Sequence, residues 1–223
     1  MTKIKICGIT RLEDALEASQ AGADALGFNF SSRSPRVINP EVAREIIRKL
    51  PPFILTAGIF VDQSPAEINA ICRYCNLQIA QLHHEDYNPQ QARSINDVKV
   101  IKVFCPQENF ATGEVLDFAK ESGINTFLFD AYRPGIPGGT GESIKKSLAS
   151  RIFNELGNSC YAILAGGLNE NNVGEAVRTT SPYGVDTATG VESAPGIKDP
   201  EKIKAFVRAV RESTDYSPPK AVT

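Results

Sequence analysis

Two side chains that can move protons stand at the ends of predicted strands. The first is Cys7, which closes a run in which Ile4 and Ile6 share one face while Lys5 and Cys7 share the other. Isoleucines suit a face covered by helices, so we expect Lys5 and Cys7 to point into the interior of a barrel. A lysine so close to a thiol would favour the thiolate, which can act as a base. The alternative is that Cys7 is an inert packing residue.

The second such side chain is Asp130, which closes the apolar run Phe127–Phe129. Burial at the end of such a strand disfavours the charged form of a carboxyl group and raises its pKa. A carboxyl with a raised pKa is suited to donate a proton near neutral pH. Asp130 is therefore a candidate general acid.

Groups that bind anions follow three other predicted strands. The loop after the second strand carries Arg33 and Arg36, and a guanidinium can hold a carboxylate or phosphate through two parallel hydrogen bonds. Glycines follow the seventh and eighth strands at Gly166, Gly167 and Gly190, where backbone N–H groups can approach phosphate oxygens. The alternatives are solvated loop arginines and ordinary turn glycines. We predict a phosphate cradle.

A further glycine-rich segment spans residues 134–141, after Asp130. It does not match a P-loop, because Glu142 takes the place of the lysine and Ile136 that of the opening glycine. We predict a flexible lid over the site.

Strand-like and helical patterns alternate along the whole chain. Capping boxes are predicted at Thr10–Glu13 and Ser64–Glu67, and Asn39-Pro40 marks another helix start. The predicted strands span residues 3–7, 24–30, 53–60, 77–82, 98–104, 124–130, 160–165 and 183–187. The predicted helices span residues 11–21, 40–50, 65–75, 89–96, 112–122, 143–156, 170–180 and 199–213.

This alternation predicts an α/β fold with a parallel sheet. Eight strand–helix units fit a single-domain (β/α)8 TIM barrel, and an open doubly wound sheet is the alternative. We assign the barrel to residues 1–212 and a flexible C-terminal tail to residues 213–223, which contain two prolines and no periodicity. In such a barrel the site lies in the loops that follow the strands.

Composition limits the classes of partner. The net charge of −2 offers no basic surface for nucleic acid, and no apolar run has the length of a membrane span. We therefore expect a cytoplasmic enzyme with a small-molecule substrate, no nucleic-acid partner and no membrane contact.

The spacing Cys72-Arg73-Tyr74-Cys75 is also found in redox and zinc sites. However, Ile68, Ile71, Cys72 and Cys75 fall on one helical stripe, where cysteine behaves as a small hydrophobic residue. The five cysteines are odd in number and scattered, which argues against a disulfide framework. We interpret Cys72 and Cys75 as packing residues and expect no metal site.

The ordered set of motifs resembles the phosphoribosylanthranilate isomerase family of tryptophan biosynthesis. No single motif decides the resemblance, but together they run in order to about residue 210. They are Lys5-Ile6-Cys7-Gly8-Ile9-Thr10, Glu13-Asp14-Ala15, Gly22-Ala23-Asp24-Ala25-Leu26-Gly27-Phe28, Ser34-Pro35-Arg36, Gln81-Leu82-His83, Asp130, Gly138-Gly139-Thr140-Gly141, Gly166-Gly167-Leu168-Asn169, Val185-Asp186 and Gly190-Val191-Glu192.

The resemblance implies an Amadori rearrangement of N-(5-phosphoribosyl)anthranilate, without a cofactor, by a monomer or a homodimer. Cys7 matches the family's general base, Asp130 its general acid and Arg36 its anchor for the anthranilate carboxylate. The positions that match the phosphate cradle are Gly166, Gly167, Thr189 and Gly190. Gln81, His83 and Asp186 match positions that line the site.

Three departures from the family pattern are present. His84 stands where glycine is usual, and Ala188-Thr189 replaces two serines. After the lid, where the family commonly has a lysine and aromatic residues, the sequence is Glu142-Ser143-Ile144-Lys145-Lys146. The departures at His84 and Ala188 leave one alternative, a non-catalytic barrel that binds a sugar phosphate. A separate alternative is another isomerase or epimerase of sugar phosphates. A metal-dependent epimerase would need several inward-facing histidines and acids, and adjacent His83 and His84 cannot both face inward.

Overall fold

The computed structural model describes residues 1–131 and 144–213. The predicted lid lies outside the described residues. Of the predicted tail, only Ser213 is described, as the last residue of the C-terminal helix α8 (Pro200–Ser213).

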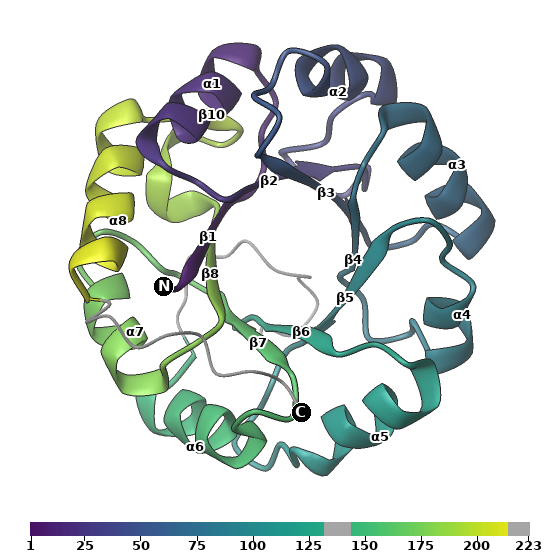
Figure 1. Cartoon of the computed structure of the whole chain (residues 1–223), viewed down its shortest axis with the longest axis vertical. Helices are drawn as coiled ribbons and strands as arrows, with labels where there is room; N and C mark the ends of the chain where they lie inside the picture. The colour runs from purple at the N-terminus through teal and green to yellow at the C-terminus, as the bar shows by residue number, and fades with distance from the viewer. Residues whose placement is uncertain (132–143, 214–223) are drawn as a thin grey trace.

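Eight parallel strands close into a barrel in the order of the sequence, as the view down the barrel in Figure 1 shows. The predicted closure is confirmed, and the open-sheet alternative is wrong. Each strand of the barrel lies within its predicted range. The strands are β1 (Lys3–Ile6), β2 (Ala25–Asn29), β3 (Leu55–Phe60), β4 (Ile79–Leu82), β5 (Lys99–Phe104), β6 (Thr126–Phe129), β7 (Tyr161–Leu164) and β8 (Gly184–Thr187).

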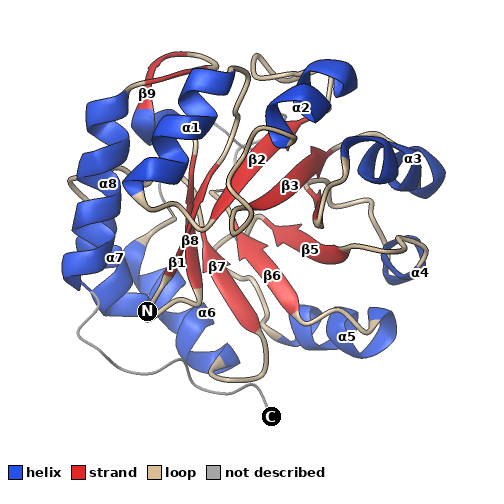
Figure 2. Ribbon diagram, turned by 45° about the horizontal axis from the view of Figure 1, so that its top comes forward, coloured by secondary structure: helices blue, strands red, loops and turns tan. Residues whose placement is uncertain are grey.

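The helices form an outer ring around the strands (Figure 2). Together with α8 they are α1 (Leu12–Ala21), α2 (Pro40–Ile47), α3 (Pro65–Cys75), α4 (Pro89–Arg93), α5 (Gly113–Ser122), α6 (Lys146–Leu156) and α7 (Val173–Thr180). The capping box at Ser64 and Glu67 is present, and Asn39 caps α2 ahead of proline. The predicted box at Thr10 is wrong: α1 begins after Arg11, and the Thr10 hydroxyl donates instead to the Gly196 carbonyl.

The apolar core has two layers. Ile4 and Ile6 face the helices in the larger layer between sheet and helices, as predicted. Cys72 and Cys75 are buried in that layer, where burial raises the pKa of their thiols to about 12 and about 11. A smaller cluster fills the barrel interior and consists of Ile101, Val103, Leu128, Ile163 and Ala165.

One element after β8 is not in the sequence-based prediction. A short 3-10 turn (η1, Thr189–Val191) leads into a hairpin of β9 (Glu192–Ala194) and β10 (Ile197–Lys198). The hairpin ends where α8 begins, and Lys198 N–H donates to the buried Asp14 of α1. The segment after the eighth strand is therefore folded against the first β–α unit.

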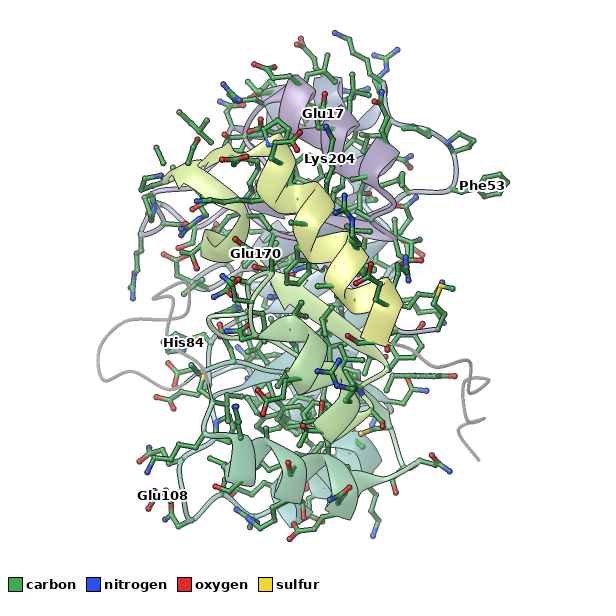
Figure 3. All side chains as sticks on the ribbon, turned by 90° about the vertical axis from the view of Figure 1, so that its left-hand side faces the viewer. Glu17, Phe53, His84, Glu108, Glu170 and Lys204 are labelled. Atoms are coloured by element: carbon green, nitrogen blue, oxygen red, sulfur yellow. The ribbon has the colours of Figure 1, made fainter. Side chains whose placement is uncertain are left out.

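The two ends of the barrel carry different loops. Figure 3 shows His84 and Glu108, which lie in loops that follow strands, on one side of the molecule. Phe53, which lies in the loop before β3, projects from the other side. The Phe53 side chain is 94% exposed. No helix within the described residues combines the length and apolarity that a membrane span requires.

Candidate active site

Cys7 sits at the mouth of the barrel, one residue beyond β1, and is partly exposed. Its sulfur lies over Gly27 of β2. A Cβ atom at Gly27 would lie 2.8 Å from Cys7 Sγ and 3.0 Å from Ile59 Cδ1. Glycine at this position therefore provides the space that the thiol occupies.

An ion pair inside the barrel lies below the thiol. Lys5 Nζ is 2.8 Å from Asp186 Oδ1, both residues are buried, and they are register partners on β1 and β8. Burial alone would lower the pKa of Lys5, but Asp186 and Cys7 together raise it. The sequence pattern placed Lys5 correctly but did not show that its charge is paired.

Lys5 favours the thiolate form of Cys7, as expected, but burial outweighs its effect on the pKa. Burial raises the pKa of the Cys7 thiol, and the nearby Asp186 carboxylate raises it further. Lys5 and Lys198 act in the opposite direction, and their effect is smaller than that of burial and Asp186 together. The sign expected for Lys5 is correct, but the net shift is upward.

Asp130 follows β6, and alternation from the inward-facing Leu128 directs it into the barrel mouth. It is buried, and its Oδ1 accepts a hydrogen bond from the Ala131 N–H at 2.8 Å. Burial raises the pKa of Asp130 to about 6, with a further upward contribution from Asp186. A carboxyl in this environment has the raised pKa that the sequence pattern predicted.

Gln81 and His83 lie on the inward face at the end of β4. Gln81 Nε2 is 3.1 Å from His83 Nδ1, and His83 Nε2 is 3.5 Å from Asp130 Oδ2. Burial lowers the pKa of His83 to about 4, so its ring is neutral near pH 7. His84 turns away and lies near Asp86, as expected for adjacent residues of a strand end.

Arg36 has a buried partner that sequence analysis missed. Its Nε and Nη2 donate to the two carboxylate oxygens of Glu192, at 2.8 and 2.7 Å. Lys198 Nζ, fully enclosed, donates to the same carboxylate at 2.8 Å. Burial alone would raise the pKa of Glu192, but Arg36 and Lys198 lower it. The side edge of the guanidinium is thus occupied, and the end that carries Nη1 has no partner among the described residues.

The two glycine loops predicted to bind phosphate lie against each other. Thr187 Oγ1 donates to the Leu168 carbonyl at 2.7 Å, and a Cβ atom at Gly190 would overlap that carbonyl. Gly166 and Gly167 both have positive φ, and they are partly exposed, like Thr189 and Gly190. The structure thus brings the four cradle positions to one part of the mouth.

Lys102 of β5 is a second group that sequence analysis did not single out. Its ammonium donates to the backbone carbonyl of His84, and Glu85 O lies 3.4 Å away. Burial lowers the pKa of Lys102 to about 8. Lys102 thereby fixes the position of the loop that begins at His83. A lysine in the middle of a strand whose neighbouring residues are apolar was the only sequence signal for this role.

Comparison with known families identifies the barrel. The family model described as N-(5'phosphoribosyl)anthranilate (PRA) isomerase matches residues 4–209. The chain belongs to the N-(5'-phosphoribosyl)anthranilate isomerase family. One relative in this family, from Pelodictyon phaeoclathratiforme, is 72% identical over 96% of this chain and 99% of its own length. Another, from Chlorobium phaeobacteroides, is 74% identical over 94% of this chain and 98% of its own.

Solved structures of isomerase family members share the whole fold. The phosphoribosyl anthranilate isomerase of Thermotoga maritima is 36% identical, with a TM-score of 0.85 over 95% of this chain and all of its own. A further structure, 34% identical with a TM-score of 0.80 over 95% of this chain and all of its own, is a complex with reduced 1-(o-carboxyphenylamino)-1-deoxyribulose 5-phosphate. A structure described as native KDPGal is 16% identical and shares only the fold.

Proposed function

We propose that this chain isomerises N-(5'-phosphoribosyl)anthranilate with Cys7 as the general base and Asp130 as the general acid. The isomerase activity, an aldose–ketose rearrangement in tryptophan biosynthesis, is that of the family to which the chain belongs. The observation that supports the two residue roles is their position. Cys7 and Asp130 both follow barrel strands at the mouth, and the Lys5–Asp186 ion pair acts electrostatically on both.

The reaction begins with proton donation. Asp130 protonates the ring oxygen of the ribose, the bond from C1 to that oxygen breaks, and the nitrogen lone pair forms a C1=N iminium. The Cys7 thiolate then removes the proton from C2. The C2–H electrons form a C1=C2 bond, and the former iminium pair returns to nitrogen. The enolamine gains a proton at C1 and loses one from the C2 hydroxyl, which gives the ketone. Because the cationic nitrogen accepts the electrons, the residues named can perform every step.

Two anchors would hold the substrate across the mouth. The open end of the Arg36 guanidinium would bind the anthranilate carboxylate while Glu192 holds the other edge. The backbone of the loops at Gly166, Gly167 and Thr189–Gly190 would bind the phosphate. Fixing both ends would place C1 and C2 between the acid and the base, which lowers the entropic cost of reaction.

The test is turnover of freshly prepared N-(5'-phosphoribosyl)anthranilate, followed by the loss of its fluorescence. We expect turnover by the unaltered chain, and a loss in kcat of roughly 10²–10⁴ in Cys7→Ala and in Asp130→Ala, typical of removing a positioned base or acid. Full kcat in either variant would refute the role of that residue. Circular dichroism of each variant would show that the loss is not caused by unfolding.

The same assay decides the two alternatives. A non-catalytic barrel would bind the substrate and leave its fluorescence unchanged. An epimerase would act on a pentose phosphate instead. It would also need several inward histidines, whereas His84 lies near Asp86 and only His83 faces the site.

The proposal includes the setting of the enzyme. Membership in a family of biosynthetic isomerases supports a cytoplasmic location and a small-molecule substrate. One related Thermotoga maritima structure, 33% identical, is described as mutually generated monomers of a dimeric enzyme. For this chain a monomer or a homodimer remains the prediction, which sedimentation equilibrium would decide.

A further inference from the structure

Two buried polar atoms at the end of β4 have no hydrogen-bond partner among the described residues. They are Oε1 of Gln81 and Nε2 of His83. Gln81 is only 1% exposed, and its place on the inward face of β4 directs it into the barrel. Because buried polar atoms are rarely left unpaired, this pair of residues needs an explanation beyond packing.

The amide nitrogen of Gln81 faces the His83 ring, and this orientation favours one tautomer of the ring. Gln81 Nε2, which can only donate, is 3.1 Å from His83 Nδ1, so Nδ1 accepts. A neutral imidazole with an acceptor at Nδ1 carries its proton on Nε2. That nitrogen lies 3.5 Å from Asp130 Oδ2, longer than a hydrogen bond. An N–H donor therefore faces the carboxyl group of the proposed acid.

Burial is the main reason that the His83 ring is neutral, and the charged groups around it act in both directions. Burial lowers the pKa of His83, Asp186 from β8 raises it, and Lys5 from β1, Lys102 from β5 and the adjacent His84 lower it. Asp130 faces the same Asp186 and Lys5. The ring is thus a fixed hydrogen-bond donor near pH 7 and does not itself carry a charge.

We propose that Gln81 is a positioning residue that holds His83 in the Nε2–H tautomer, so that His83 can donate to Asp130 as Asp130 gives up its proton. This inference rests on the proposed function, because it assumes that Asp130 is the acid. As Asp130 becomes a carboxylate, the Nε2–H of His83, now 3.5 Å from Asp130 Oδ2, would move closer and form a charge-assisted hydrogen bond with it. The opposite tautomer would place a nitrogen lone pair against that carboxylate and oppose proton donation.

Nitrogen NMR of histidine tests the tautomer directly. The chain has two histidines, so ¹⁵N-histidine labelling gives two ring systems, and His84→Asn identifies the signals of His83. At pH 7 we expect a protonated, pyrrole-type Nε2 and an unprotonated, pyridine-type Nδ1. A proton on Nδ1, or on both nitrogens, in the unaltered chain would overturn the inference whatever the activity.

Two substitutions at Gln81 test its role in setting the tautomer of His83. Gln81→Glu offers only acceptor oxygens to Nδ1, so we expect the proton to move to Nδ1. Gln81→Met removes the donor without adding charge, and we expect a mixture of tautomers. In both variants kcat should fall by about tenfold or more while KM changes little. The acid limb of the kcat/KM profile should also move to higher pH, because Asp130 loses the Nε2–H donor of His83. Unchanged tautomers or an unchanged limb in Gln81→Met would overturn the proposal.

Failure of this inference and failure of the proposed function give different results. If the unaltered chain shows the Nε2–H tautomer but does not turn over N-(5'-phosphoribosyl)anthranilate, the function is wrong and the tautomer assignment stands. If it turns over the substrate with His83 protonated at Nδ1, the function stands and the role given to Gln81 is wrong.

Discussion

At the scale of single residues, the proposed acid Asp130 and the proposed base Cys7 have pKa values in the reverse of the usual order. Burial raises the pKa of Asp130 to about 6 and raises that of Cys7 above its ordinary value. The reactive form needs Asp130 protonated and Cys7 ionised. Because the pKa of the acid is the lower of the two, that form is a small fraction of the free enzyme, and its fraction is constant between the two pKa values.

The pH profile of kcat/KM should therefore be flat across neutral pH. We expect it to fall below about pH 6, where Cys7 ionisation decreases while Asp130 is already protonated. On the alkaline side it should fall only above the ordinary cysteine pKa of about 8.5. Initial rates at low substrate from pH 5 to pH 10 would measure both limbs. A rate independent of pH between 5 and 7 would contradict the assignment to Asp130.

Gly27 gives a test of how closely the base is positioned. In Gly27→Ala the new methyl group would lie 2.8 Å from Cys7 Sγ, so the thiol must move. We expect kcat to fall by roughly 10- to 100-fold, since a displacement of about 1 Å at a reacting group costs about that much. Gly113→Ala is the matched control, because nothing lies within 4 Å of its added methyl group. Equal kcat in the two variants would show that the thiol position is not critical.

The sequence was sufficient to place some site residues but not their partners. Alternation located Lys5 and Cys7, and the apolar run before Asp130 located the acid, because both patterns are local. The partners Glu192 of Arg36 and Asp186 of Lys5 come from the far end of the chain, and only barrel closure brings them near. The net rise in the Cys7 pKa depends on three-dimensional burial, which no spacing along one strand reveals.

At the scale of elements, the β9–β10 hairpin supports Arg36 through Glu192 and Lys198. Glu192→Gln would leave two buried cations close together, so we expect a loss of about 3–5 kcal/mol in the free energy of unfolding, as for other broken buried pairs. KM should rise as Arg36 loses its fixed orientation. Urea unfolding and substrate titration measure the two effects.

Lys198→Met is the matched control for that experiment. It removes one cation and leaves a balanced pair of Arg36 and Glu192, so the cost in unfolding free energy should be smaller than for Glu192→Gln. If Lys198→Met destabilised the protein as much as Glu192→Gln, the charge argument would fail and loss of packing would explain both.

The strands and helices themselves were largely predictable, because apolar periodicity and proline-marked helix starts are local signals. Ser64-Pro65 and Asn39-Pro40 begin helices where predicted. Thr10 failed as a cap since its hydroxyl finds the Gly196 carbonyl in the hairpin, a tertiary contact that the sequence pattern does not contain. The hairpin was missed because its strands are only three and two residues long.

At the scale of the whole molecule, stability and chemistry are located in different parts of the barrel. Ile68 of α3 is fully buried between helices and sheet. Ile68→Ala should lower the free energy of unfolding by about 2–5 kcal/mol. Because the proposed site lies at the barrel mouth, away from Ile68, kcat per folded molecule should stay unchanged. Urea unfolding together with kcat on the same preparation tests this separation, and a large loss of kcat in fully folded protein would contradict it.

The most direct test of the account is a crystal structure of this chain with the reduced product analogue 1-(o-carboxyphenylamino)-1-deoxyribulose 5-phosphate. We predict that the sugar chain lies between Cys7 Sγ and the Asp130 carboxyl, each within about 3–4 Å of it. The carboxylate should meet Arg36, and the phosphate should meet the backbone near Gly166 and Gly190. A ligand held elsewhere, or one that only one of Cys7 and Asp130 reaches, would contradict the account.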